Sequence, residues 1–427
     1  MTASVMVWLV CNAQNHQHDL LKIQGGNVMS TVIIIGSGGV ASVAAQKCAQ
    51  NHKVFTTIII ASRTLAKCEA IVQRMKSFPV KAIAEQVDAE SKVQMVKLIQ
   101  KYKPTLVMNL ALPYQNIPIM EACIETKTHY LDTAAAEVRE KAGFEYSTQW
   151  VYHDRFKQAG VMALLGTGFD PGVTSVFCMY GKKHYFDTVD YIDILDANGG
   201  DHGYPFATNF NPEINIREIT MPGRYFENGK WVEIPALTVK ETYPLDEIGP
   251  KDMYLMYHEE LESIVKFIPE VKRARFYMSF SERYLTHLRV LVNVGMTSVK
   301  PIMYEGKSIV PLQFLKAILP DPSSLGPRTK GKTNIGVILQ GHKQGKPVAY
   351  RVYNVCDHQE AFAEVGSQAI SYTTGVPAMI GAALILTKQW TGQGVFNVEQ
   401  FNPDPYMAML NQWGLPWKET FSPVLVK

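Results

Sequence analysis

The feature that most constrains the fold is a strand-like run that leads directly into a glycine-rich turn. Thr31 to Ile35 is rich in β-branched residues, as expected of a strand buried inside a parallel sheet. The chain continues as Gly36-Ser37-Gly38-Gly39-Val40-Ala41 and then places small and apolar residues at helical spacing. The pattern G-x-G-x-x-A between a strand and a helix is typical of a turn that binds the pyrophosphate of a dinucleotide. Alone the motif is weak, because small residues at such a turn can also serve packing.

Strand-like and helix-like segments then alternate at short spacing, which strengthens the motif. Five further strands are predicted at 57–61, 80–87, 105–110, 129–133 and 161–165. Such alternation favours a doubly wound parallel sheet, so the fold class is α/β and residues 29–168 form a Rossmann domain.

The remainder of the chain divides into two parts. Residues 169–356 carry longer alternating strands and few helices, which predicts an α+β substrate or dimerisation domain with a mixed or antiparallel sheet. Residues 357–427 return to helices, which we expect to pack back on the Rossmann domain. Residues 1–28 are expected to be a poorly ordered N-terminal extension, with a short targeting or docking segment as the alternative.

Three segments of the second part give specific expectations. Asn334–Leu339 and Val348–Tyr353 flank a turn rich in glycine and lysine, which predicts a hairpin. The β-branched stretch Leu288–Met296 is expected to be a strand, and Asp252–Phe267 a helix. On that helix His258 and Glu262 would share one face.

Composition excludes several classes of function. Lys and Arg total 42 against 39 Asp and Glu, so the small positive excess predicts neither a nucleic-acid nor a membrane partner. The six cysteines form no C-x-x-C pair and no metal-ligand cluster is visible, so we expect reduced thiols, a cytoplasmic location and no metal. No stretch of about 18 apolar residues suggests a membrane span.

The end of the second strand indicates which nicotinamide cofactor binds. NAD enzymes place a carboxylate there to accept a hydrogen bond from the ribose 2′-hydroxyl. This chain has Ser62-Arg63 instead, and an arginine suits a 2′-phosphate. The sequence therefore favours NADP(H), although Arg63 could also be an ordinary surface arginine.

Other cofactor contacts are expected at the carboxyl ends of the remaining strands. Asp88 would meet the adenine or cap the next helix, and Asn109 would meet the nicotinamide ribose or order its own loop. The full set of predicted cofactor-binding residues is Gly36, Ser37, Gly38, Gly39, Val40, Ala41, Ser62, Arg63, Thr64, Asp88, Asn109, Ala111 and Pro113.

Longer motifs resemble a known family. The glycine motif with Ser62-Arg63, followed by Asn109–Pro113 and His129–Ala134, is similar to the saccharopine dehydrogenase-like superfamily. Gly168-Phe169-Asp170-Pro171-Gly172-Val173-Thr174-Ser175 and the segment from Asp357 to Ala378 resemble the carboxynorspermidine synthases within it. The resemblance runs from about Met29 to the C-terminus.

This resemblance implies a reaction and an assembly. L-Aspartate 4-semialdehyde would condense with putrescine or 1,3-diaminopropane, and NADPH would reduce the imine; the enzyme would be a homodimer. A protonated imine accepts hydride more readily, so we expect an acid near the nitrogen. The candidates are Asp170, His202 and Asp132.

The substrate carries both amines and a carboxylate, so its pocket should hold polar and charged groups of both signs. The predicted substrate-binding residues are Asn198, Asn209, Arg217, His258 and Glu259. Two alternatives remain at this stage: a saccharopine dehydrogenase or other opine-type reductase, which would use an amino acid as the amine, and an NADP(H)-binding sensor or scaffold.

Overall fold

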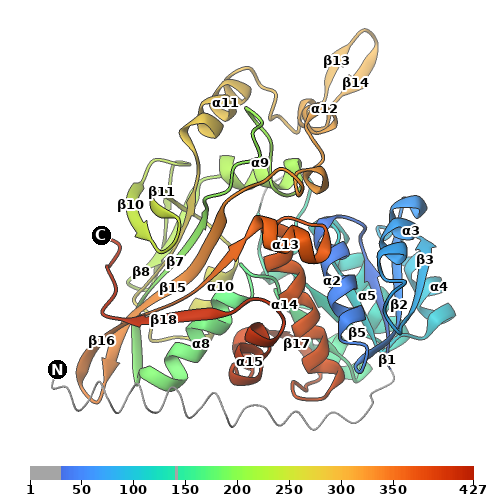
Figure 1. Ribbon diagram of the computed structural model, residues 1–427, viewed down its shortest axis with the longest axis horizontal. Coiled ribbons are helices and arrows are strands. Elements are labelled where there is room, and N and C mark those ends of the chain that lie inside the picture. The colour runs from blue at the N-terminus through green and yellow to red at the C-terminus, as the bar shows by residue number, and fades with distance from the viewer. Residues whose placement is uncertain (1–29, 140–142) are drawn as a thin grey trace.

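The computed structural model describes residues 30–139 and 143–427, so the predicted extension 1–28 lies outside the described residues. Two sheets organise the chain. In Figure 1 a parallel sheet flanked by helices lies at the right and a larger mixed sheet at the left, with helices from the C-terminal part between them.

The first sheet has seven parallel strands in the order β17-β6-β5-β4-β1-β2-β3. The strands are β1 (Ser30–Ile35), β2 (Phe55–Ser62), β3 (Lys81–Gln86), β4 (Leu106–Asn109), β5 (His129–Asp132), β6 (Met162–Leu165) and β17 (Gly394–Asn397). The helices beside them are α2 (Gly39–Gln50), α3 (Leu65–Arg74), α4 (Lys92–Tyr102), the short η1 (Pro113–Gln115), α5 (Asn116–Thr126), α6 (Ser147–Trp150) and α7 (His153–Ala159).

This order confirms the predicted doubly wound sheet. β1 lies inside the sheet between β4 and β2, and its residues Val32 to Ile35 are buried, which explains their β-branched character. The strand order reverses between β1 and β4, and doubly wound sheets bind ligands at the carboxyl ends of strands beside such a reversal.

The second sheet has nine strands, and β12–β7 is its parallel pair. Its strands are β7 (Thr188–Asn198), β8 (Gly223–Glu227), β9 (Lys230–Ile234), β10 (Lys240–Leu245), β11 (Gly249–Met256), β12 (Arg273–Ser279), β15 (Lys332–Lys343), β16 (Lys346–Asp357) and β18 (Trp417–Phe421). The mixed sheet and the β15–β16 hairpin agree with the sequence expectation. The helices of this part are α8 (Val173–Tyr185), α9 (Pro212–Thr220), α10 (Glu260–Phe267), α11 (Glu282–Asn293), α12 (Pro311–Ile318) and η2 (Pro322–Ser324).

Two local expectations in this part are wrong. The predicted strand Leu288–Met296 lies mostly in α11, where Ser281 caps the helix by accepting from the Tyr284 amide. Its β-branched valines are exposed on the helix surface instead of pairing in a sheet. The predicted helix Asp252–Phe267 begins as β11, and the helix starts only at Glu260.

The C-terminal segment contributes to both halves of the molecule. Its helices are α13 (His358–Val365), α14 (Ala369–Leu386), the short η3 (Val398–Gln400) and α15 (Asp404–Gln412). α14 packs along α2, while β17 and β18 join the first and second sheets respectively. Among the described residues, α14 is long and apolar enough to cross a membrane, but 89% of it is buried within the protein. We therefore read it as a core helix.

Candidate active site

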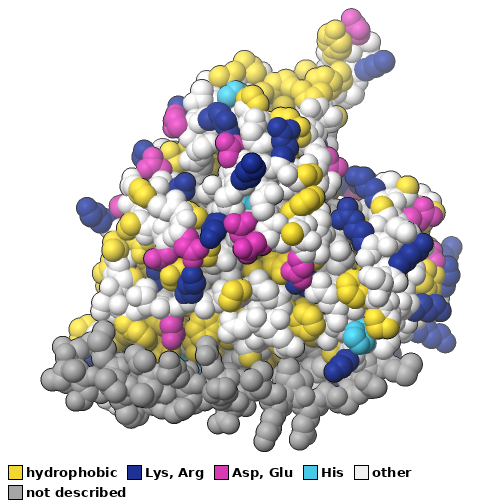
Figure 2. All heavy atoms as spheres, viewed as in Figure 1, with side chains coloured by type: hydrophobic (Ala, Val, Ile, Leu, Met, Phe, Trp, Pro, Cys, Tyr) yellow, Lys and Arg dark blue, Asp and Glu magenta, His cyan; other side chains and the backbone are white. Residues whose placement is uncertain are grey.

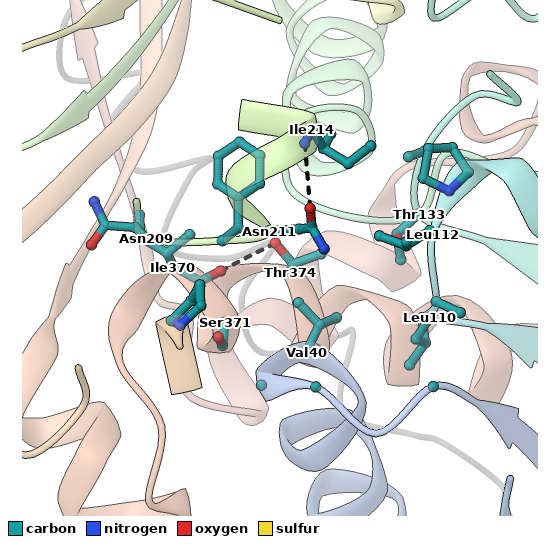
Figure 3. A pocket seen from close by; sticks show the side chains of 18 of the residues that line it. Val40, Leu110, Leu112, Thr133, Asn209, Asn211, Ile214, Ile370, Ser371 and Thr374 are labelled. Atoms are coloured by element: carbon teal, nitrogen blue, oxygen red, sulfur yellow. Dashed lines mark hydrogen bonds between the residues drawn. The ribbon is translucent and has the colours of Figure 1, made fainter. Parts of the chain in front are cut away.

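A cavity of about 750 Å³ lies between the two sheets, at the carboxyl edge of the parallel strands. Figure 3 shows that its wall combines elements far apart in the sequence. Val40 comes from α2, Leu110 and Leu112 follow β4, and Ser371 and Thr374 come from α14. The loop before α9 closes the opposite side: the Asn211 side chain caps that helix by accepting from the Ile214 amide.

The glycine-rich turn forms one end of the cavity. Gly36 has φ +120°, and a Cβ atom there would lie 2.6 Å from the Leu110 carbonyl oxygen, so only glycine fits. Gly38 faces open space: an added Cβ would meet nothing within 4 Å. Gly38 also precedes α2 without a side-chain cap, which leaves the first amides of the helix free for an anion. These features fit a dinucleotide pyrophosphate.

The turn after β2 brings two basic side chains to the cavity. Ser62 Oγ donates to Ser37 Oγ at 2.9 Å, which ties this turn to the glycine turn. Arg63, Thr64 and Lys67 line the same wall. Lys67 Nζ lies 3.3 Å from an Asp321 carboxylate oxygen across the cleft, and both side chains are more than half exposed. Two cations beside a hydroxyl suit a 2′-phosphate.

The structure separates the predicted cofactor residues into two groups. The glycine turn from Gly36 to Val40, the turn from Ser62 to Thr64, and Ala111 and Pro113 line the cavity. The other three do not line it: Ala41, Asp88 and Asn109.

Each of these three has a structural role. Ala41 is fully buried in α2. Asp88 accepts from the Glu90 amide at 3.1 Å, and Ser91 caps the following helix in its place. Asn109 orders its loop by accepting from the Ala111 amide at 3.2 Å.

Asp170 enters the cavity on a tight turn after β6. The Gly168 amide donates to the Pro171 carbonyl at 2.8 Å, and the Val173 amide donates to the Gly168 carbonyl at 3.1 Å. Gly172 has φ +138°, and a Cβ there would lie 2.2 Å from the Gly168 oxygen. This packing explains why glycines surround Asp170, and it fixes the carboxyl group at the cavity wall.

A second aspartate, Asp196 of β7, lies against Asp170. Both are half-buried and line the cavity, and their carboxyl groups are hydrogen-bonded to each other. Burial raises the pKa of Asp170 well above its usual value, and the neighbouring Asp196 raises it further. Two carboxyl groups that are hydrogen-bonded to each other share a proton, because ionising both would place two negative charges side by side. The pair therefore keeps a proton near neutral pH.

His258 lies beside this pair in a buried group of carboxylates. Its Nδ1 atom is hydrogen-bonded to Glu260, and the Glu259 and Glu218 carboxylates are each 3.4 Å from the ring nitrogens. Burial alone would lower the pKa of His258, but Glu260 and Glu259 outweigh it and hold the pKa well above the usual value. The spacing of His258, Glu259 and Glu260 would also suit a metal ion, but the hydrogen bond between His258 and Glu260 pairs these groups with each other.

The predicted partnership of His258 and Glu262 is wrong. His258 precedes α10, so the two residues do not share a helix face. Glu262 instead accepts from the Tyr146 amide at 3.0 Å and pairs with Arg224.

Two of the three predicted acids do not line the cavity. Asp132 is buried beneath it and accepts from the Gly166 amide at 2.8 Å and from Gln149 at 2.7 Å. Burial raises its pKa to about 7, although these hydrogen bonds lower it. Asp132 is therefore placed to hold the strand ends, not to reach substrate. His202 lies in its own loop, where it accepts from the Tyr204 amide at 3.1 Å.

The predicted substrate residues divide in the same way. Asn209, His258 and Glu259 line the cavity. Asn198 accepts from the Gly200 amide and contacts His358, so it orders the loop after β7. Arg217 is buried away from the cavity, where it pairs with Glu137 and donates to the carbonyls of residues 138 and 139.

The cavity residues that sequence reasoning missed include two carboxylates beside Asp170 and His258, namely Asp196 and Glu218. Asp196 lies near the end of a strand whose alternation was visible, so an acidic residue on the inward face was a usable signal. Glu218 lies in the last turn of α9, and the sequence does not show which face of that helix meets the other domain.

Comparisons with known proteins agree with this geometry. Residues 32–164 match the model of the saccharopine dehydrogenase NADP binding domain, and residues 168–415 match that of the saccharopine dehydrogenase C-terminal domain. Apo saccharopine dehydrogenase (L-Glu forming) from Saccharomyces cerevisiae has the same fold, with a TM-score of 0.70 at 15% identity over 92% of this chain and 99% of that one.

Two curated relatives are much more similar in sequence. A carboxyaminopropylagmatine dehydrogenase from Synechocystis sp. is 55% identical over 92% of this chain and 98% of the relative. A carboxynorspermidine synthase from Vibrio cholerae is 44% identical over 91% and 96%. The fold and the cavity define an NADP(H)-dependent oxidoreductase, which confirms the cofactor prediction. The chain belongs to the saccharopine dehydrogenase family.

Proposed function

We propose that this protein catalyses the NADPH-dependent reductive condensation of L-aspartate 4-semialdehyde with a primary amine that carries a second cationic group. The observation that carries the proposal is the opposite charge of the two ends of one cavity. Arg63 and Lys67 lie at the end beyond the glycine turn, and Asp170, Asp196 and Glu218 line the part formed with the second domain.

The order of the strands sets the distance between these ends. Arg63 follows β2, Asp170 follows β6, and β1, β4 and β5 lie between them. With neighbouring strands about 4.8 Å apart, the two ends are roughly 19 Å apart. A dinucleotide that places its 2′-phosphate at Arg63 crosses the strand-order reversal and points its nicotinamide toward Asp170.

The chain's own residues then supply the acid that the reaction needs. Condensation of aldehyde and amine releases water and leaves an imine, and bound NADPH supplies the hydride for the imine carbon. The Asp170–Asp196 pair holds a proton at the cavity wall, so Asp170 is placed to protonate the imine nitrogen. Phe210, Ile214 and Met278 also line the cavity and offer apolar contact to a methylene chain.

The relatives suggest which amines to test. The name of the Synechocystis relative contains agmatine, whereas that of the Vibrio relative contains norspermidine. Putrescine, 1,3-diaminopropane and agmatine all carry one reacting amine and one distant cation. The acidic lining disfavours the opine-type alternative, since glutamate or lysine would bring a further carboxylate, in addition to that of the aldehyde, to the cavity that Asp196 and Glu218 line.

The direct test follows NADPH oxidation at 340 nm with L-aspartate 4-semialdehyde and each of the three amines. We expect a rate that requires both aldehyde and amine and that is much lower with NADH. Matched reactions with glutamate or lysine are the controls. A rate with these amino acids and none with the three amines would refute the proposal.

We also propose that the protein forms a homodimer through an apolar arm and acts in the cytoplasm. The arm comprises α11, α12 and the hairpin β13 (Ile302–Tyr304) and β14 (Lys307–Ile309), which projects from the molecule in Figure 1. Figure 2 shows hydrophobic side chains gathered over this arm. The exposed large apolar residues there are Val290, Val292, Val294, Ile302, Met303, Tyr304, Phe314 and Ile318. An apolar group of this extent favours protein association, and the five described cysteines are free, as in a reducing compartment.

Light scattering after size-exclusion chromatography tests the dimer. We expect a mass twice the 47.8 kDa of the chain, and we expect the double variant Met303→Glu/Phe314→Glu to elute as a monomer because charge is costly in an apolar interface. Val151→Glu is the matched control, since Val151 is 73% exposed outside the arm. A monomeric wild type, or a double variant that stays dimeric, would contradict the proposal.

A further inference from the structure

One carboxylate on the cavity wall has a buried oxygen that makes no hydrogen bond. Glu218 lies on α9 with 6% of its surface exposed, and it lines the cavity. Its Oε1 atom is buried and makes no hydrogen bond within the described part of the chain. The nearest cationic atom is His258 Nε2 at 3.4 Å. Buried oxygens are normally hydrogen-bonded, so an oxygen without a hydrogen bond on a residue that lines a cavity points to a ligand.

The neighbouring carboxylates are already engaged. Glu259 Oε1 accepts from the Ala135 amide at 3.1 Å, and Glu260 is hydrogen-bonded to His258. The carboxyl groups of Asp170 and Asp196 are hydrogen-bonded to each other. Of these described carboxylates, Glu218 is the one with a buried oxygen that makes no hydrogen bond.

We propose that Glu218 binds, as a carboxylate, the cationic group at the far end of the amine substrate, and so selects amines that carry two cations over monoamines. This inference rests on the proposed function, because it assigns one residue to one end of that substrate. The ligand is an alkyl chain that ends in an ammonium or guanidinium group.

The charge of the wall favours the amine over the aldehyde as the ligand of Glu218. L-Aspartate 4-semialdehyde also carries an ammonium group, but its carboxylate is attached to the same carbon and would come close to Glu259 and Asp196. The basic residues that line the cavity are Arg63 and Lys67 after β2, Lys316, whose ammonium lies 3.0 Å from a Glu213 oxygen, and His258, which is already paired with Glu260. The far end of a diamine or agmatine has no anion to accommodate.

The groups that face Glu218 lead us to expect that its carboxyl group releases a proton when a cation binds. They are His258, Glu259, Glu260 and Asp196, and Tyr284 packs from α11. Burial raises the pKa of Glu218 to about 8, although His258 lowers it. In the empty site the carboxyl group therefore holds a proton at pH 7, and a bound cation must displace it.

The test compares wild type with Glu218→Gln in NADPH oxidation, with L-aspartate 4-semialdehyde and matched amines. The dicationic amines are putrescine, 1,3-diaminopropane and agmatine, and butylamine is the monocationic match. We expect the variant to lower kcat/KM about 10- to 100-fold for the dicationic amines, mainly through KM, and to leave butylamine unchanged. The aldehyde KM should not move.

Two controls separate this effect from loss of structure. Glu282→Gln changes an exposed carboxylate of α11 and should behave as wild type. Glu218→Asp should recover part of the preference for two cations, because it restores a carboxylate. Since Glu218 Oε1 has no hydrogen bond to lose, we expect Glu218→Gln to melt at or above the wild-type temperature.

Calorimetry provides a readout that does not depend on turnover. Putrescine, or agmatine, is titrated into the NADP⁺-bound enzyme at pH 7 in two buffers of different ionisation enthalpy. Release of roughly one proton per site by wild type, and none by Glu218→Gln, supports the assignment. If the variant binds the amine as tightly as wild type, or if the aldehyde KM rises instead, the assignment is wrong even where wild type turns over. If wild type reduces no imine, the proposed function fails, and the proton release still decides whether Glu218 binds cations.

Discussion

Replacing Asp170 with asparagine is expected to lower kcat by about 10²- to 10⁴-fold while NADPH binding is retained. Asparagine keeps the shape of the side chain and its place on the turn between Gly168 and Gly172. It cannot, however, carry the proton that Asp170 shares with Asp196. The measurement is steady-state turnover together with NADPH binding by fluorescence titration. Asp187→Asn, which changes an exposed carboxylate paired with Lys343, is the control.

The Asp170–Asp196 pair also predicts how kcat depends on pH. Burial raises the pKa of Asp170 well above its usual value, so the acid form persists at neutral pH. We expect kcat to fall on the alkaline side, as the pair loses its shared proton, and this fall should be absent from the residual activity of Asp170→Asn. A wild-type kcat in the variant would show that another group protonates the imine.

The second large effect is expected at the 2′-phosphate end of the cavity. Arg63→Ala should weaken NADPH binding about 10- to 100-fold, since a charged hydrogen bond contributes roughly 1.5–3 kcal/mol and each 1.4 kcal/mol is tenfold. NADH binding should change little, because NADH lacks the phosphate. Arg63 is exposed and lines the cavity beside Lys67. Lys67 lies 3.3 Å from Asp321, so its charge is partly offset and Arg63 is the more available cation.

Equilibrium titration of both cofactors measures this difference. Lys76→Ala is the matched control, because Lys76 is an exposed cation just past α3 that does not line the cavity. Equal loss of NADPH and NADH affinity would mean that Arg63 supports the fold of the turn and does not recognise the phosphate.

The parts of the site that the sequence predicted are those built from local structure. Gly36 and Ser62 lie at the ends of buried strands, and short-range patterns of β-branched and small residues identify such positions. Asp170 was found for the same reason, since it lies in the turn that follows a strand. Asp132 also lies at the end of a strand but is buried below the cavity, where Gln149 and the Gly166 amide donate to its carboxylate.

The parts that were missed depend on contacts between distant segments. Glu218 lines the cavity only because α9 packs against the opposite domain. The spacing of residues along α9 does not show which of its faces makes that contact. α11 was mistaken for a strand because Val290, Val292 and Val294 are β-branched, whereas the helix buries Leu285 and Leu288 at helical spacing and leaves the valines exposed. β17 was also missed, and its place in the first sheet depends on pairing with β6, more than 200 residues earlier in the chain.

The position of β17 has a consequence for how the chain is made. Its residues 394–397 pair with residues 162–165 of β6, so the sheet gains its last strand more than 200 residues after the other six have been synthesised. Translation adds about 5–20 residues per second. The free backbone edge of β6 therefore stays open to other chains for on the order of 10 s or more on each ribosome, and neighbouring nascent chains on one messenger are the nearest candidates to pair with it.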